Sequence, residues 1–224
     1  MNILELFCGT KSIGKCCDKL GWNSVSVDME KKFNPTHLCN IMDFDYKQYP
    51  KDYFDIVWSS PPCTEYSKAK SRGIRDIDGA NKIVIRTIEI INYFNCEYWF
   101  MENPQSGRLK DRDIMKDLPY YDVDYCKYSD WGYRKRTRIW TNKEGWNNLM
   151  CKKDCDNIID GLHKSRMGTS KSIIDDGKLI RVNTAELRKK YKDYKNENDT
   201  LNTDTTKHDR YRIPEDLIFS LFLE

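Results

Sequence analysis

The strongest constraint on the fold is a regular alternation of short apolar strands with amphipathic helices between residues 2 and 141. Residues 2–7, NILELF, are typical of a buried strand, and apolar residues then recur at helical spacing from Ile13 to Leu20. Further strands are expected at residues 23–28, 55–58, 98–101, 120–126 and 138–141, and further helices at 80–95 and 111–117. This order predicts an α/β fold with a doubly wound sheet.

Residues with polar or special side chains stand at the ends of the expected strands. In a doubly wound sheet, ligands bind just beyond the carboxyl ends of the strands, so these positions are candidates for a functional site. They are residues 7–9, Asp28, residues 60–63, Glu102 and Asn103.

The chain of 224 residues is long enough for one domain, or two at most. It holds no apolar run of about eighteen residues, which argues against a transmembrane helix. Its first residues, MNILELFCGT, lack the basic leader and cleavage site of a secretory signal. The nine cysteines are therefore interpreted as reduced thiols in an intracellular, reducing compartment.

The composition changes after Asn142, which divides the chain into three expected parts. Residues 1–142 carry the strand and helix alternation and are expected to form the catalytic core. Residues 143–212 are rich in Lys, Asp and Asn, which predicts a small or loop-rich region. Residues 213–224 are apolar again, and Pro214 suits the first turn of a helix that returns to the core.

Cys63 is a candidate nucleophile because it follows two prolines at a strand end, in SSPPCTEYS. Prolines stiffen a loop, and a stiff loop holds a thiol at fixed geometry. A thiolate also needs electropositive surroundings. Four cations follow within a dozen residues: Lys68, Lys70, Arg72 and Arg75. The alternative is a small apolar residue in a buried turn.

Glu102 ends an aromatic strand, in YWFMENPQSG, where partial desolvation would suit a proton donor. The alternative is that Glu102 bonds a local backbone amide. Asp28 stands where an acid often binds ribose hydroxyls, or else caps a turn. Gly9 would let the backbone approach a ligand, although residues 9–14 match neither a dinucleotide loop nor a phosphate loop.

Residues 134–153 hold seven cations against Glu144, interleaved with tryptophan and tyrosine. This run is typical either of a phosphate-binding surface or of a solvated face. The cations are Arg134, Lys135, Arg136, Arg138, Lys143, Lys152 and Lys153.

A second cluster of potential ligands lies in the same part of the chain. Cys151, Cys155 and His163 are close in sequence, and Cys126 could join them through space. Three cysteines and a histidine would suit structural zinc, but Cys-x3-Cys with one distant histidine has low specificity for a zinc site. We therefore predict no metal and keep zinc at these four residues as the alternative.

Five segments in this order resemble the motif series of cytosine carbon-5 methyltransferases, especially the short forms of phages and large viruses. They are LELFCGT, VSVD, SSPPCTEYS, FMENPQ and RKRTRIW. The resemblance covers residues 1–142 and the tail segment RIPEDLI. It implies a Rossmann-like S-adenosylmethionine-dependent methyltransferase fold, DNA as partner, and a location in the cytoplasm, a viral factory or the nucleus of an infected host.

The resemblance also implies roles for individual residues. Cys63 matches the nucleophile, Glu102 the carboxyl at ring nitrogen 3, and Arg136 and Arg138 the arginines that help hold the base. The cofactor would be bound by Phe7, Gly9, Thr10, Asp28, Asn40, Ile41 and Pro62.

The chemistry of the residues agrees with these roles. A thiolate that adds at carbon 6 of cytosine makes carbon 5 able to attack a methyl sulfonium. A carboxyl at nitrogen 3 and an arginine at the exocyclic oxygen stabilise the charge that this addition creates. A base within a duplex must first flip out to reach Cys63.

Several positions depart from the family pattern. Lys11 stands where the cofactor loop normally has glycine, and Asn40 where an acid usually bonds the adenine amine. Thr64 and Arg134 each replace a frequent glutamine. Residues 143–212 are short for a separate target-recognition domain, so recognition is expected to be reduced or supplied by a protein partner.

Three alternatives to a DNA cytosine methyltransferase remain open at this point. One is a tRNA cytosine-5 methyltransferase, since one branch of the family acts on tRNA. The second is an inactive family member that binds DNA or a partner, for which Lys11 is the best support. The third is an amino-methyltransferase, which would need an aromatic residue in place of Cys63 to stack on the base.

Overall fold

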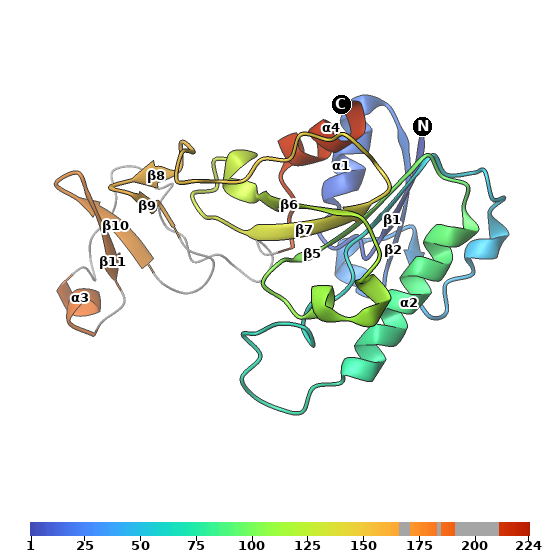
Figure 1. The fold of residues 1–224 in the computed structure, drawn as a ribbon, viewed down its shortest axis with the longest axis horizontal. Helices are drawn as coiled ribbons and strands as arrows, with labels where there is room; N and C mark the ends of the chain where they lie inside the picture. The colour runs from blue at the N-terminus through green and yellow to red at the C-terminus, as the bar shows by residue number, and fades with distance from the viewer. Residues whose placement is uncertain (166–170, 183–184, 191–210) are drawn as a thin grey trace.

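A seven-stranded sheet forms the centre of the computed structural model, which describes residues 1–165, 171–182, 185–190 and 211–224 (Figure 1). The strand order is β3-β2-β1-β4-β5-β7-β6; β1 to β5 are parallel, and β7 is antiparallel to both neighbours. The strands are β1 (Asn2–Leu6), β2 (Asn23–Asp28), β3 (His37–Leu38), β4 (Ile56–Ser59), β5 (Tyr98–Pro104), β6 (Tyr120–Asp124) and β7 (Arg136–Thr141). The predicted α/β class with a doubly wound sheet is confirmed.

Helices cover both faces of this sheet (Figure 1). Strand side chains alternate between faces, so Leu4 packs with helix α2 (Ile77–Tyr93) while Ile3 packs with helices α1 (Ser12–Leu20) and α4 (Glu215–Leu223). Full burial of each such side chain contributes roughly 1.5–3 kcal/mol. The chain therefore holds two apolar layers, one on each side of a shared sheet.

Helix α4 closes the second layer, as its apolar sequence predicts. Leu217, Ile218 and Leu221 are fully buried, and α4 contacts α1. The Lys143 ammonium donates a hydrogen bond to the carbonyl of Leu221 at 2.9 Å, which ties the end of α4 to the segment after β7.

Several expected elements differ from the structure. The strand expected at residues 120–126 ends at Asp124, and Tyr125–Lys127 forms a 3₁₀ turn. Residues 111–117 were expected to be helical, but this described stretch forms two 3₁₀ turns, Leu109–Asp111 and Asp113–Met115. The segment has few apolar side chains and is soon followed by Pro119 and β6, so it is too short to offset helix nucleation. Strand β5 runs on through Glu102 to Pro104 because β7 pairs with it as far as Thr137.

The segment after β7 forms short hairpins beyond the β6–β7 end of the sheet (Figure 1). They are β8 (Ile158–Ile159) with β9 (Leu162–His163), and β10 (Lys171–Asp175) with β11 (Lys178–Val182), followed by α3 (Ala185–Lys190). Part of the predicted region 143–212 lies outside the described residues, so its independence as a domain stays a prediction. None of the described helices is both long and apolar enough to cross a membrane.

Candidate active site

Cys63 and Glu102 come from neighbouring parallel strands whose carboxyl ends meet at one edge of the sheet. Cys63 follows β4 through the turn at residues 60–62, and Glu102 lies inside β5. The side chain of Asn103 donates a hydrogen bond to the Pro61 carbonyl at 2.8 Å. This buried bond joins the proline loop to β5, so it holds the cysteine loop in a fixed position relative to the carboxyl.

Glu102 is only 6% exposed and has two polar neighbours. The Tyr125 hydroxyl donates to its Oε1 at 3.2 Å, and the Lys135 ammonium lies 3.3 Å from the same oxygen. The Lys135 ammonium also lies 4.6 Å from the centre of the Tyr125 ring. A buried charge requires a partner, and Lys135 is the partner of Glu102.

Cys63 lies within electrostatic reach of this pair. Burial raises the pKa of the Cys63 thiol, the Glu102 carboxylate raises it further, and the Lys135 ammonium lowers it. Two of the cations that follow Cys63 in sequence are held by Glu65: Lys70 pairs with its carboxylate at 2.6 Å, and the Arg75 guanidinium donates to its carbonyl. The cation that lowers the pKa of the thiol is Lys135, and it does not outweigh burial and Glu102.

The two predicted base-holding arginines are paired with aspartates of β6. Arg138 makes two hydrogen bonds to Asp122, at 2.8 and 2.9 Å, and Arg136 makes two to Asp124, at 3.0 and 2.8 Å. In the β5–β7 register Arg138 is opposite Asn103, whereas Ile139 is opposite Glu102. Arg138 and Glu102 thus face opposite sides of the sheet, and the structure does not bring them together.

Lys135 and Tyr125 are site residues that sequence reasoning did not select. In the run RKRTR all four cations were treated as one basic group. Alternation along the strand was the available signal for Lys135. It places Arg136 and Arg138 on one face of the sheet, and Lys135 with Thr137 on the other. Tyr125 carried no signal of its own, since a buried tyrosine is common in a core.

The expected cofactor residues surround a loop with unusual backbone angles. Phe7, Gly9 and Lys11 have φ values of 60°, 46° and 54°. The Asp28 carboxylate accepts hydrogen bonds from the backbone N–H groups of Gly9, at 2.9 Å, and Glu30, at 2.8 Å. Each carboxylate oxygen keeps a further lone pair, so Asp28 could still accept ribose hydroxyls.

The remaining expected cofactor residues lie close to this loop in sequence or follow β3 and β4. Asn40 is exposed, and its side-chain oxygen accepts a hydrogen bond from the Met42 N–H at 3.0 Å. Ile41 is buried, Pro62 is exposed, and the Thr10 hydroxyl lies 3.1 Å from that of Ser12. A carboxylate with spare lone pairs beside bare glycine backbone fits a ribose-bearing cofactor such as S-adenosylmethionine.

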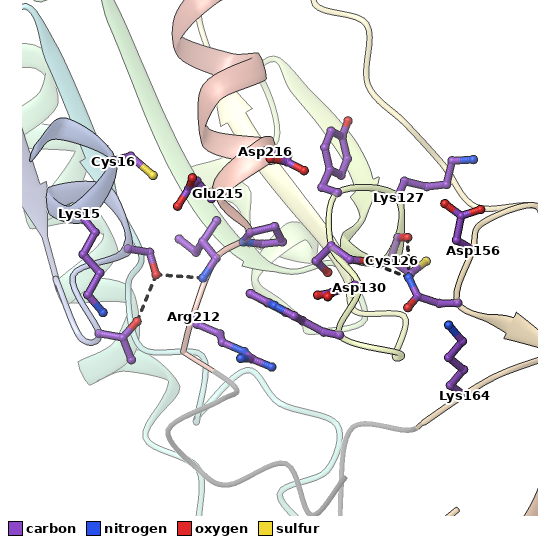
Figure 2. Close-up of a pocket in the computed structure, with 18 residues that line it drawn as sticks. Lys15, Cys16, Cys126, Lys127, Asp130, Asp156, Lys164, Arg212, Glu215 and Asp216 are labelled. Carbon is purple, nitrogen blue, oxygen red and sulfur yellow. Dashed lines mark hydrogen bonds between the residues drawn. The ribbon is translucent and has the colours of Figure 1, made fainter. Parts of the chain in front are cut away.

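A cavity of about 780 Å³ opens between the start of α1, the start of α4 and the segment 126–131 (Figure 2). Figure 2 shows cations and carboxylates intermixed around it, among them Lys15 near Glu215 on one side and Lys127 and Lys164 near Asp156 on the other. The Arg212 guanidinium lies 3.8 Å from the centre of the Trp131 ring. The cavity walls include Thr10 but none of the three residues Cys63, Glu102 and Asp28, so the cavity does not contain the candidate active site.

The basic run at 134–153 does not form one phosphate-binding surface. Lys135 and Lys143 are each only 8% exposed, with their ammonium groups held by Glu102 and by the Leu221 carbonyl. Arg136 and Arg138 are held by β6, as described above. The buried Lys135 and Lys143 therefore belong neither to a phosphate-binding surface nor to a solvated face, whereas phosphate contact by Arg136, whose side chain is 35% exposed, stays a prediction.

Cys126, Cys151, Cys155 and His163 do come together. Their ligating atoms all lie within 4.8 Å of one another, with Cys126 and Cys151 buried. The four residues come from the turn after β6, the loop at 151–155 and strand β9. Sequence spacing left this cluster as an alternative, because only the fold brings Cys126 to the other three.

Comparison with known proteins connects this geometry to a family. The family model described as C-5 cytosine-specific DNA methylase matches residues 1–216. The Frog virus 3 (isolate Goorha) protein named "Probable DNA (cytosine-5)-methyltransferase" is 38% identical over 174 residues, which are 70% of this chain and 79% of that protein.

Two solved structures share part of the fold. A protein assigned as a prophage-encoded DNA modification methyltransferase (E. coli) has a TM-score of 0.46 and 13% identity, covering 63% of this chain and 46% of its own. A Spodoptera frugiperda DNMT2 mutant has a TM-score of 0.43 and 18% identity, covering 67% and 53%. This chain thus spans about half the length of each solved chain.

Proposed function

The chain belongs to the C-5 cytosine-specific DNA methylase family, and from this premise we propose that Cys63, Glu102 and Lys135 form its reaction centre. The enzyme transfers a methyl group from S-adenosylmethionine to carbon 5 of cytosine in DNA. The observation that carries the assignment is the buried pair of Lys135 with Glu102 of β5, the strand to which the Asn103–Pro61 hydrogen bond ties the loop that bears Cys63 at the carboxyl edge of β4 and β5. No other group of described residues combines a nucleophile, a proton donor and a matching cation at this edge.

The cofactor is proposed to bind at the neighbouring edge, over β1 and β2. S-adenosylmethionine supplies an electrophilic methyl group when it is bound. Asp28 would hold the ribose hydroxyls, because its carboxylate is oriented by the Gly9 and Glu30 amides and keeps lone pairs free. The left-handed backbone at Gly9 leaves room for close approach, and Ile41 would contribute an apolar contact.

Cys63 is proposed to act as the nucleophile. Its thiolate forms a bond to carbon 6, and the electron pair of the carbon 5–carbon 6 double bond makes carbon 5 nucleophilic. Carbon 5 would take the methyl group without its bonding pair, which stays on the sulfur of the cofactor. A base then removes the proton from carbon 5, and the electron pair of that carbon–hydrogen bond re-forms the carbon 5–carbon 6 double bond as the bond from carbon 6 to Cys63 breaks. The electron pair of the broken carbon–sulfur bond leaves with Cys63 as thiolate, so atoms and charges balance.

Glu102 and Lys135 are proposed to stabilise the charge that addition creates. The carboxyl would share a proton with ring nitrogen 3, while the ammonium of Lys135 stays hydrogen-bonded to the carboxyl. Tyr125 orients Glu102 from the other side. The roles of Arg136 and Arg138 in holding the base remain predictions, and they would require their pairs with Asp124 and Asp122 to loosen on base binding.

The test is methyl transfer from labelled S-adenosylmethionine to unmodified duplex DNA and, in parallel, to bulk tRNA. Product nucleosides are identified by mass spectrometry, and 5-methylcytosine in DNA is the expected result. Duplex DNA with 5-fluorocytosine supplies the mechanistic test, because fluorine at carbon 5 blocks the final proton loss and leaves the Cys63 adduct in place. Label in tRNA alone would reassign the substrate, and label in neither would contradict the proposed activity.

Target recognition is proposed to be reduced, or to be supplied by a protein partner. The segment 143–212 is all that lies between β7 and the final helix, and its described part consists of short hairpins and one short helix. We further propose a reducing compartment, the cytoplasm, a viral factory or the nucleus of an infected host. All nine cysteines are free thiols in the structure, which supports this setting.

A further inference from the structure

We propose that Cys126, Cys151, Cys155 and His163 bind one structural zinc ion. The four ligating atoms lie within 4.8 Å of one another and belong to three separate segments of the chain. Three thiols and an imidazole are a donor set that zinc prefers, and four protein ligands complete its coordination. The site would therefore be structural, with no position left open for a substrate.

The distances between the ligating atoms match a tetrahedron around zinc. Zinc–sulfur and zinc–nitrogen bonds of about 2.3 and 2.05 Å place two sulfurs about 3.8 Å apart and a sulfur and a nitrogen about 3.6 Å apart. The Cys151 and Cys155 sulfurs are 3.6 Å apart, and each lies 3.6 Å from His163 Nε2. Cys126 Sγ lies 3.2 Å from the same nitrogen. Small shifts would bring all four to bonding distance.

Hydrogen bonds around the cluster hold the ligands in place before a metal arrives. The Lys153 N–H donates to the Cys151 sulfur at 3.3 Å, and Lys153 adopts a left-handed φ of 68° that folds the loop back on itself. The Asn157 amide is 2% exposed and donates to the carbonyls of Cys126, at 3.0 Å, and Ser129, at 2.7 Å. Such outer contacts orient metal ligands and raise affinity.

Two other interpretations of the cluster explain less of it. A disulfide between Cys151 and Cys155 would use two of the four groups and leave Cys126 and His163 without a reason to converge. A cluster of ordinary buried thiols would not require a histidine whose Nε2 lies within 3.6 Å of all three sulfurs. A zinc ion accounts for the identity and the position of all four residues.

The proposed ion would connect the hairpin region to the reaction centre. Cys126 directly follows Tyr125, whose hydroxyl contacts Glu102, and the Cys151 N–H donates to Asp124 at 3.0 Å. Strands β8 and β9 have two residues each, too short to be stable as an isolated hairpin. Metal binding would supply the missing free energy of folding and hold the segment from Asp124 to Cys126 in place.

The test is the metal content of the full-length protein, purified without chelator from cells grown with zinc. Elemental analysis should give about one zinc per chain in the wild type and in the Cys96→Ser control, which removes a half-buried thiol outside the cluster. Loss of an outer contact alone weakens metal affinity about 10- to 100-fold, so loss of the Cys155 ligand in Cys155→Ser should lower zinc affinity at least that far, measured by competition with a chelator of known affinity. Cys155→His keeps a ligand at this position and should retain the metal.

Cobalt substitution supplies a second readout that is independent of methyl transfer. Wild-type protein exchanged with Co²⁺ should show the intense visible absorption of tetrahedral cobalt with thiolate ligands, and Cys155→His should show a weaker thiolate charge-transfer band. Wild-type protein with neither zinc nor this spectrum would overturn the proposal. So would a Cys151–Cys155 disulfide in the native protein, or equal zinc affinity of the wild type and Cys155→Ser in the chelator competition.

Discussion

The Lys135 ammonium lies 3.3 Å from the Glu102 carboxylate, and both side chains are more than nine-tenths buried. Pairs of this kind are costly to break from one side, because the remaining charge keeps its desolvation cost and loses its partner. Both charges also act on Cys63: after burial, the Glu102 carboxylate raises the pKa of the thiol and the Lys135 ammonium lowers it.

Removal of Lys135 should impair both the fold and the reaction. Lys135→Met leaves Glu102 buried without a cation and should destabilise the protein by about 3–5 kcal/mol, measured by urea unfolding. The double variant Lys135→Met with Glu102→Gln should regain most of this stability but no methyl transfer. Lys127→Met, which removes a more solvent-accessible pair with the exposed Asp154, should cost less. Equal losses in the two lysine variants would contradict the buried pair.

Cys63→Ala should abolish methyl transfer while leaving the melting temperature close to that of the wild type. The side chain is small and only partly enclosed, so its truncation leaves no large cavity. Adduct formation with 5-fluorocytosine DNA should also disappear, as seen by a denaturing gel. Cys96→Ser should retain both signals, and methyl transfer by Cys63→Ala would remove Cys63 as the nucleophile.

Alkylation of Cys63 should become faster with rising pH. Burial and the Glu102 carboxylate raise the pKa of this thiol, so the reactive thiolate is a small fraction at neutral pH and grows as pH increases. Glu102→Gln should speed alkylation by iodoacetamide at neutral pH, and Lys135→Met should slow it. The readout is mass spectrometry of the peptide with Cys63; rates that do not depend on pH would show that the thiolate is already formed.

Lys11→Gly should stabilise the cofactor loop. Lys11 holds a left-handed φ of 54°, which costs a non-glycine residue about 1–2 kcal/mol. Glycine relieves this cost and removes a side chain from the expected cofactor site, so calorimetry should show tighter binding of S-adenosylmethionine. Lys15→Gly, one turn further along α1, should instead lower stability by about 1 kcal/mol. Equal or weaker cofactor binding by Lys11→Gly would show that Lys11 does not impair cofactor binding.

Glu5 should make stability depend on pH. Burial raises the pKa of this carboxyl from 4.5 to about 7, although it accepts hydrogen bonds from the Ile13 and Gly14 amides. Between these pH values the unfolded chain has lost the proton that the folded protein retains, so the free energy of unfolding should fall as pH rises. The loss is about 3 kcal/mol and is complete above the folded pKa.

The check on Glu5 is a series of urea unfolding curves across this range. Glu5→Gln should flatten the pH dependence, and Glu144→Gln, which changes an exposed carboxyl, should leave it as in the wild type. Parallel curves for wild type and Glu5→Gln would rule out Glu5 as the source.

The sequence predicts the sheet and the position of Cys63 and Glu102 because both depend on local signals. Apolar alternation predicts strands, and the special residues stand where the strands end. The role of Lys135 could not be predicted, because a run of like charges does not indicate which of its side chains are buried. The cluster of Cys126 with Cys151, Cys155 and His163 depends on the return of the chain to the end of β6, and sequence spacing carries no information about such a contact.

Three successive residues, Asp124 to Cys126, contact three different parts of the structure. Asp124 pairs with Arg136, Tyr125 contacts Glu102, and Cys126 joins the Cys/His cluster. A substitution here would disturb the contacts of one residue, but an inserted or deleted residue would rotate every later side chain to the wrong direction at once. The length of this segment should therefore stay constant among functional variants, while the surface loops beyond it remain free to grow or shrink.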